Sequence, residues 1–585
     1  MWKGLTILLL ISPITGYAPP GSGLPRGVIG RITSENAIAC APPAVTCAPP
    51  AVTCAPPNPA SITPDADGRY APVFPGWGHY HYPVSTTDDS AQFYFDQGLN
   101  LYYSYHLTES AASFREAQLK DSRCAMAFWG EALALGPYYN STYFYKMPPE
   151  VLPVIDKMNT LAPTASQKEK ALIKALNHRY SNDTTDSHRT RLNHDWSQAA
   201  HALVLQYPDD NDIKALYIDG VMTEHAWDLW GPEGRPRSWT PELVNYCEAI
   251  LKNNPDHPAA LHYHIHLLEA SGHPEATLPS AERLKDLMPG VAHMTHMASH
   301  SYQRTGHYDK GVAINDSANA ALKNYSGLAP QLRLSPTATH YDAVETFCAM
   351  NGGMYRKAMQ SALKCRTAIA SRPGTPKPNV QYLAMFPDFV LVRLGKWQEI
   401  LDQPLPDSSW VYARVISYFA RGLAFVRTGN QSAAEACLDS LRKNKRDPSL
   451  TQHNLPFNEA IKGTEIAENI LAAEILAARN ANGAAAAFQR AEIIEDGMSY
   501  LEPKDWPLPV RHFAAAWLLR TGKPAKAENL YREDLAQNPG NGWSLLGLAQ
   551  SLDAQRKAPD YAADYRARAK AAFAQAEQMP PASSW

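Results

Sequence analysis

The sequence predicts an all-α protein, built as a solenoid of stacked helix hairpins. From Asp88 onward, apolar residues recur at i, i+3, i+4 and i+7, in blocks of about 12 to 16 residues that Gly, Pro and Asn-Pro breaks separate. No stretch of alternating apolar and polar residues is bounded by turns, so we expect no sheet. A chain of 585 residues is also too long for one ordinary hydrophobic core, which favours a repeat architecture.

The predicted hairpins follow the tetratricopeptide pattern, in which small residues let helices cross closely and large residues fill the gaps. The clearest match is Trp543, Leu546 and Gly547, after a break at Pro539. The matching residues of two earlier hairpins are Gly98, Ala111, Phe114 and Ala117 in one, and Gly422 and Ala434 in the other. We therefore expect a tetratricopeptide-like α-solenoid, with N-terminal repeats in residues 76–375 and C-terminal repeats in residues 376–585.

The composition describes a folded protein whose main partner is not a nucleic acid. Hydrophobic residues make up 45% of the chain and charged residues 19%, which suits a packed core rather than a disordered chain. The formal net charge is −3, whereas a protein that binds phosphate backbones needs a surplus of basic residues. No run of about 18 apolar residues appears, so we expect no membrane span.

Residues 1–18 have the features of a signal peptide. Lys3 supplies a positive charge, residues 5–11 form a short apolar segment, and Gly16 and Ala18 are small residues near a cleavage point. These features predict export, to the periplasm or to the outside of a bacterial cell.

Residues 19–75 have the composition of a Pro-rich and Cys-rich low-complexity linker, which we expect to be extended. They include the CAPPAVT repeats with Cys40, Cys47 and Cys54. The other five cysteines are scattered through helical sequence without CxxC spacing. We expect these five to be buried as small apolar residues.

Histidines concentrate between His257 and His307, where nine of the chain's 20 histidines lie. Their spacing is helical, because at about 100° per residue several of them fall on two narrow stripes. The first stripe consists of His262, His266 and Glu269. The second stripe consists of His293, His296 and His300.

The two stripes are predicted to face each other across a groove. Gly and Pro breaks divide the region into helices over residues 258–271, 274–288 and 291–305. The first and third are successive inner helices, which stack side by side along the concave groove of a tetratricopeptide array. His264 lies on the opposite face of its helix, so we exclude it from the site.

Imidazole nitrogens and a carboxylate oxygen near a common point are ligands for zinc, copper or iron. His262 and His266 have the i, i+4 spacing of a helical chelate, and Glu269 is either a ligand or a group that orients one. The second stripe completes a four-ligand site or builds a second site, and Met297 beside it favours copper. The alternative is a metal-free groove whose histidines hydrogen-bond one another or a peptide. The predicted metal ligands are His262, His266, Glu269, His293, His296, His300 and, from a third inner helix, His340.

Other histidines and aromatic residues are weaker candidates. We expect His79 and His81 in a surface turn, and His106 solvated near the first hairpin turn. The segment from His225 to Trp230 predicts a buried plug or an aromatic wall for a ligand. The chain has no GxSxG, GxGxxG, HExxH or P-loop motif, so nucleophile-elbow, nucleotide and common zinc-protease chemistry lack support.

Six motifs of the chain are long enough to be specific. They are FDQGL from Phe95, SFREA from Ser113, CAMAFWGEALALGP from Cys124, HYHIHLLE from His262, HMASH from His296 and YREDLAQNPGNGWSLLGL from Tyr531. In these motifs the chain resembles a group of secreted bacterial tetratricopeptide repeat proteins. The resemblance implies a helical-repeat fold over residues 76–585 and, through the histidines, a metal site, but it supplies no activity. Where those proteins tend to read Phe-Asn-His in the first hairpin turn, this chain has Tyr105-His106-Leu107.

We predict an exported binding or scaffold protein whose concave groove holds a histidine-rich transition-metal site and takes a protein or peptide ligand. One alternative is a metal-dependent hydrolase or oxidase that uses the same histidines, with Glu269 as a base if it is not a ligand. A second alternative is a metal-free protein–protein adaptor. An oligomer is compatible with each of these functions.

Overall fold

The computed structural model describes residues 57–585, except 187, 232–233, 453 and 456–457. Over these residues the chain forms helices α1 to α26 and one small hairpin. The all-α prediction is confirmed, and the hairpin, β1 (Asn454–Leu455) antiparallel to β2 (Asn458–Glu459), is the only departure from it among the described residues. The predicted signal peptide (residues 1–18) and residues 19–56 of the predicted linker lie outside the described residues.

The helices are mostly short and follow one another closely along the chain. The first thirteen are α1 (Asp89–Tyr103), α2 (Leu107–Lys120), α3 (Ala125–Ala134), α4 (Val151–Leu161), α5 (Gln167–Asn177), α6 (Arg189–Gln206), α7 (Asn211–Glu224), α8 (Thr240–Asn253), α9 (Pro258–Leu268), α10 (Leu278–Leu287), α11 (Ala292–Thr305), α12 (Tyr308–Leu328) and α13 (Thr339–Asn351). The others are α14 (Tyr355–Ala370), α15 (Pro378–Ala384), α16 (Phe386–Arg393), α17 (Trp397–Asp402), α18 (Val411–Arg427), α19 (Gln431–Lys445), α20 (Ser449–Gln452), α21 (Ala460–Ala478), α22 (Ala484–Asp496), α23 (Val510–Arg520), α24 (Pro524–Gln537), α25 (Gly542–Ala554) and α26 (Pro559–Ala572).

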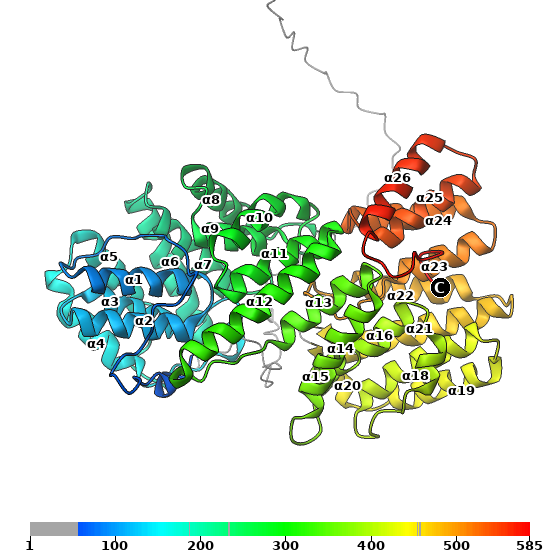
Figure 1. Cartoon of the computed structure of the whole chain (residues 1–585), viewed down its shortest axis with the longest axis horizontal. Helices are drawn as coiled ribbons and strands as arrows, with labels where there is room; N and C mark the ends of the chain where they lie inside the picture. Colours follow the sequence, from blue (N-terminus) through cyan, green and yellow to red (C-terminus); the bar gives the residue numbers. More distant parts are fainter. Residues whose placement is uncertain (1–56, 187, 232–233, 453, 456–457) are drawn as a thin grey trace, which may run out of the picture. The chain divides into compact units, whose positions relative to one another are not determined.

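Consecutive helices pack as hairpins, as Figure 1 shows for α1 with α2, α11 with α12, α18 with α19 and α25 with α26. The inner helices of successive hairpins also touch, because α9 contacts α11 and α11 contacts α13. Contacts within each hairpin and between neighbouring hairpins are the defining arrangement of an α-solenoid. The predicted tetratricopeptide-like class is therefore confirmed.

Small and large residues interlock at the hairpins where the sequence predicts close crossings. The buried ring of Phe114 lies against Gly98 of α1, where an added β-carbon would come within 2.9 Å of it. A β-carbon added at Gly130 of α3 would lie still closer to the same ring. Near the C-terminus, a β-carbon added at Gly547 would overlap the ring of Tyr531 in the same way. These glycines leave room for an aromatic ring between two helices, which a larger residue would exclude.

Residues 57–75 pack onto the first helix pair instead of extending as a free linker. Ile62 and Phe74 are buried. The amide of Phe74 donates a hydrogen bond to Gln97 at 3.0 Å, and Arg115 donates one to the carbonyl of Ile62 at 2.6 Å. The prediction of a linker up to residue 75 is wrong for this segment, because its few apolar side chains are stabilised by burial despite the Pro-rich sequence around them.

Two close approaches between glycines hold the ends of α11, the helix that carries three candidate ligands. Before the helix, the amide of Gly290 donates to the carbonyl of Gly76 at 3.1 Å. After it, Gly306 ends the helix with a φ of +78° and lies directly against the backbone of Gly540. A side chain at either contact would collide with backbone atoms. Segments distant in sequence therefore fix the position of α11.

The buried apolar side chains form two large clusters, one drawn from residues between Ile62 and Leu332 and one from residues between Tyr308 and Phe573. The five cysteines of the helices are buried and free, as predicted. None of the helices in the described part of the chain combines the length and the apolar character that crossing a bilayer requires.

Candidate metal centre

Three successive inner helices bring the predicted ligands together. His262 and His266 come from α9, His293, His296 and His300 from α11, and His340 from the start of α13. Glu269 directly follows α9. The rings of His262 and His293 lie 5.0 Å apart between centroids, and those of His266 and His300 lie 5.9 Å apart. The prediction that the two stripes face each other is confirmed.

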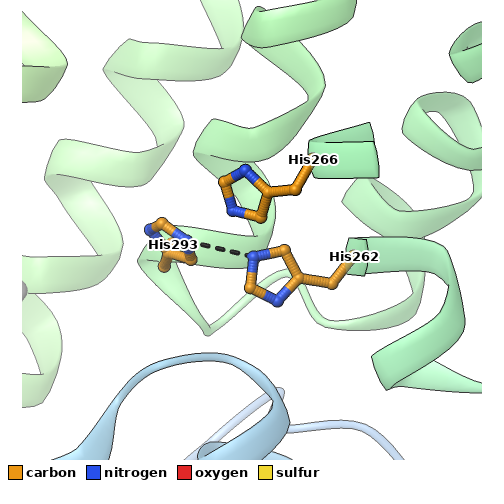
Figure 2. A group of neighbouring side chains, drawn as sticks. All are labelled: His262, His266 and His293. Atoms are coloured by element: carbon orange, nitrogen blue, oxygen red, sulfur yellow. Dashed lines mark hydrogen bonds between the residues drawn. The ribbon is translucent and has the colours of Figure 1, made fainter. Parts of the chain in front are cut away.

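The first group of histidines, which we call the first triad, consists of His262, His266 and His293. Figure 2 shows their rings turned toward one another, with a hydrogen bond between His262 and His293. Nδ1 of His262 donates to the carbonyl oxygen of Tyr103 at 2.7 Å, so its Nε2 faces His293, whose Nε2 lies 3.2 Å away. Nε2 of His266 is buried and has no hydrogen-bond partner among the described residues. Such an orphaned nitrogen suits a bound cation.

The second triad consists of His296, His300 and His340. Nε2 of His296 lies 2.9 Å from Nε2 of His300 and 3.1 Å from Nε2 of His340. Nδ1 of His296 donates to Oδ1 of Asn315 at 2.6 Å, and the amide nitrogen of Asn315 donates to a backbone carbonyl, which fixes that orientation. The proton of His296 is thus held away from the triad, and its Nε2 lone pair points inward.

Glu269 connects the two triads. Its carboxylate accepts a hydrogen bond from Nδ1 of His266 at 3.1 Å and another from Nδ1 of His300 at 2.8 Å. A carboxylate on the outer nitrogen of a histidine fixes the ring and makes the inner nitrogen a better ligand. Of the two roles predicted for Glu269, these contacts fit the orienting group. The ligand role stays open, because Glu269, His266 and His300 also form a third group of possible metal ligands.

Glu502 is a second orienting carboxylate, and it is not among the predicted site residues. It is buried, contacts Nδ1 of His300 and accepts a hydrogen bond from the hydroxyl of Tyr500. Burial opposes the charged form of His300, but the carboxylates of Glu502 and Glu269 outweigh this effect and raise the pKa of His300 to about 10. No motif near residue 502 points to this role, because only long-range packing brings the segment to α11.

The other imidazoles of the triads are kept neutral by burial. Burial, reinforced by nearby histidines, lowers the pKa of His262, His293 and His296 well below the ordinary value. It also lowers the pKa of His266 and of His340 to about 3. Neutral imidazole is the form that binds a metal ion, so these five rings need to lose no proton.

Tyr105 and His106 also belong to the site, although the sequence predicts a solvated turn there. Tyr105 has a φ of +56°, and its ring lies 4.6 Å from that of His262. His106 is buried with Glu109, and its Nε2 accepts a hydrogen bond from the amide of His293 at 3.3 Å. The prediction of solvation is wrong because α11 covers this turn. A non-glycine residue at positive φ is typical of functional sites.

The cluster is enclosed rather than open to a groove. His262 and His296 are 0% exposed, and His293 is 4% exposed. Tyr105 covers one side and Glu502 the other, which corrects the expectation of an open histidine face. His264 points away to Ser280, and His79 lies at the surface, both as predicted.

The spacing of the ring nitrogens fits a metal ion. Two ligands at about 2.0–2.1 Å from a tetrahedral ion are roughly 3.3–3.4 Å apart. The Nε2 atoms of His296 and His300, at 2.9 Å, and those of His262 and His293, at 3.2 Å, come close to this spacing. A proton forms a hydrogen bond between two nitrogens only, whereas three nitrogens can coordinate one metal ion at the same time. All the ligand nitrogens of each triad lie within 4.8 Å of one another.

A cavity of about 740 Å³ adjoins the centre, with His266 and Glu269 in its lining. Trp227 and Trp230, from the aromatic segment that the sequence marks as a plug or a wall, also line it. The ring of Trp227 stacks on Tyr139 at 4.9 Å. The aromatic segment therefore forms a wall of the cavity.

The fold and the site define an all-α helical-repeat protein with a buried histidine cluster. No protein-family model matches the chain, and no curated protein matches its sequence. Among solved structures the chain is similar to the human IFIT1 dimer with m7Gppp-AAAA, at 12% identity over 85% of this chain and 92% of that one, with a TM-score of 0.31. It is also similar to yeast Tom70, at 9% identity over 82% of this chain and 92% of that one, with a TM-score of 0.27. Similarities this low carry no argument about function.

Proposed function

We propose that this helical-repeat protein binds transition-metal ions, zinc, copper or iron, at the two triads. The observation that carries the proposal is the second triad, where three Nε2 atoms converge around His296 while its Nδ1 is committed to Asn315. A bound ion would supply Lewis-acid or redox chemistry at this place. Imidazole is a ligand for all three metals, so the donor set alone leaves the choice among them to experiment.

The protein's own residues would hold the ions by fixing each ring before binding. The Tyr103 carbonyl, Asn315 and Glu269 occupy the outer nitrogens of four imidazoles, so the inner nitrogens face the ion. His300, whose pKa is raised to about 10, would release its Nε2 proton when the ion binds. Burial keeps competing water away from the rings. A site prepared in this way loses little conformational entropy when the ion binds.

Thermal unfolding tests the proposal, because an ion that binds only the folded chain raises the melting temperature. We expect Zn²⁺ or Cu²⁺ to raise the Tm of the full chain, purified without a His tag, by several degrees. The double variant His266→Ala/His296→Ala should lose this shift. The matched control is His273→Ala, whose side chain is 85% exposed. An unchanged Tm in the wild type would favour the metal-free adaptor instead.

A metal-dependent enzyme is the second candidate, favoured by the cavity beside His266 and Glu269. Three protein ligands with a further position open to a substrate are the arrangement of catalytic zinc sites. Hydrolysis of p-nitrophenyl acetate and oxidation of catechol, measured with zinc-loaded and copper-loaded protein, test for the predicted hydrolase or oxidase. Turnover equal in the wild type and in His266→Ala would rule this function out.

The predicted scaffold role and export extend the proposal. In this role the repeats carry the metal centre, and a protein or peptide ligand binds in the concave groove of the repeats. Export is tested by fractionating bacteria that produce the full chain and by sequencing the N-terminus of the recovered protein. Periplasmic protein that begins after residue 18 is the expected result.

A further inference from the structure

The cavity beside the metal centre has the size and lining of a small-molecule site. Its volume of about 740 Å³ lies within the usual range for ligand pockets. Trp227 contributes flat apolar surface, and the rest of the lining is rich in charged side chains. The distribution of these charges indicates which ligand the cavity takes.

Each acidic side chain of the lining already has a partner. Glu269 accepts from His266 and His300, Asp228 from Arg237, Asp496 and Glu533 from Arg511, Asp534 from Ser544 and His512, Asp505 from Asn458, and Glu495 from the amide of Val510. These carboxylates are therefore engaged within the protein.

Two cations of the lining have no carboxylate partner among the described residues. Arg304 is buried and donates to the backbone carbonyls of Glu269, Ser271 and Gln537, and its guanidinium lies 5.0 Å from the ring centre of Tyr500. Its Nε has no hydrogen-bond partner in the part of the chain that the structure describes. The ammonium of Lys504 forms no ion pair or hydrogen bond with any residue in the described part of the chain. Burial and the charge of Arg304 lower the pKa of Lys504, as expected of two cations near each other. The nearby carboxylates of Glu495 and Asp534 oppose this effect without reversing it.

We propose that the cavity binds a small organic anion, whose carboxylate or phosphate group is held by Lys504 and Arg304. A flat apolar part of the same molecule would lie against Trp227. The physical reason is that two neighbouring cations repel each other and that the buried ammonium of Lys504 has no ion pair among the described residues, so an oxyanion that bridges the two cations offsets this cost. The inference goes beyond the metal sites, because it requires no bound ion.

Phenyl phosphate is a suitable probe, because it combines a phosphate with an aromatic ring. Its binding to the full chain is measured by tryptophan fluorescence at low ionic strength, with protein as purified and after removal of metal. Benzyl alcohol is the neutral comparison, and benzoate shows whether a carboxylate replaces the phosphate. We expect Lys504→Met to weaken phenyl phosphate binding by about tenfold or more, as loss of a charged hydrogen bond predicts. Lys504→Arg should restore most of the affinity.

The matched control is Lys526→Met, at an exposed lysine outside the cavity, and it should bind phenyl phosphate as the wild type does. The proposal is overturned if phenyl phosphate binds neither form of the protein, or binds Lys504→Met and the wild type equally. If Lys504→Met fails to fold, the affinities of the wild type for phenyl phosphate and benzyl alcohol are compared instead. Benzyl alcohol binding as tightly as phenyl phosphate would then overturn the proposal. Because binding is also measured without metal, failure here leaves the proposed metal sites unaffected.

Discussion

Glu269 and His300 come from neighbouring inner helices and meet at 2.8 Å, where the carboxylate accepts the Nδ1 proton of the imidazole. The other carboxylate oxygen of Glu269 holds His266 of the first triad. One side chain thus orients a ring in each triad, and the two sites share a single support. This relationship makes Glu269 the residue whose loss should affect both sites together.

Replacing Glu269 by alanine should weaken metal binding at both triads by about 10-fold to 100-fold, because orienting groups typically contribute that much to affinity. Competition with a chromophoric chelator measures the two affinities in the full chain. Glu275→Ala is the control, since that side chain is 52% exposed and pairs only with the exposed His273. Loss of affinity at one triad alone would contradict a shared support.

Glu502→Gln should instead weaken the second triad much more than the first. Glu502 contacts His300 of the second triad, whereas it acts on His266 of the first only through its charge. We expect about a tenfold loss, since glutamine still accepts a hydrogen bond but carries no charge. The same chelator competition in a His293→Ala background isolates the second triad. An equal loss in His340→Ala, which isolates the first, would show that Glu502 acts on the whole chain.

The sequence predicts the helices of this site and the histidines that share a helix face well, because helical spacing depends on residues only a few positions apart. The expected helices over 258–271 and 291–305 correspond to α9 (Pro258–Leu268) and α11 (Ala292–Thr305). The convergence of His262 and His266 on the second stripe follows from the stacking of inner helices. Both helices end within a few residues of the expected positions, where Gly and Pro breaks stop them.

The remaining parts of the site depend on contacts that no local pattern encodes. Glu502 reaches His300 from a loop near the C-terminal repeats, and His106 reaches His293 from the first hairpin. Both segments cover the histidines, so the expected open groove is a closed centre. The prediction for residues 57–75 is wrong for a similar reason. The segment is Pro-rich overall, and its few apolar side chains, which pack on α1 and α2, do not stand out in the composition.

The pKa of Glu345, a residue of α13 outside the metal centre, predicts that the stability of the fold depends on pH. It is buried, and burial raises its pKa to about 7, although Lys357 pairs with it. Because the folded pKa exceeds the unfolded one, the folded state binds more protons between about pH 4.5 and 7, and stability falls as the pH rises through this range. Glu345→Gln removes the titration. From pH 5.5 to 8.5 the variant should gain about 2 kcal/mol relative to the wild type.

Unfolding midpoints at the two pH values measure this difference. Glu275→Gln, at an exposed position, should show no relative change and serves as the control. A Glu345→Gln variant that is equally destabilised at both pH values would contradict the raised pKa and would leave only the lost pairing with Lys357.

The glycine at the close crossing of the C-terminal hairpin predicts a packing effect. Gly547→Ala should destabilise the fold by about 1–3 kcal/mol, because the new methyl group would overlap the buried ring of Tyr531. Gly327→Ala is the matched control, since nothing lies within 4 Å of its added β-carbon in α12. Alanine there should stabilise the helix by about 0.5–1 kcal/mol. Thermal unfolding of both variants measures these changes in stability. Equal changes would contradict the requirement for a small residue at position 547.

Elemental analysis of the untagged full chain, dialysed against Zn²⁺ and then against metal-free buffer, tests the central claim most directly. The two-triad centre predicts about two ions per chain in the wild type and in the exposed-site control His273→Ala. It predicts about one in His293→Ala and in His340→Ala, and none when both are combined. Metal-free wild-type protein, or a stoichiometry that none of these histidine substitutions changes, would contradict the account.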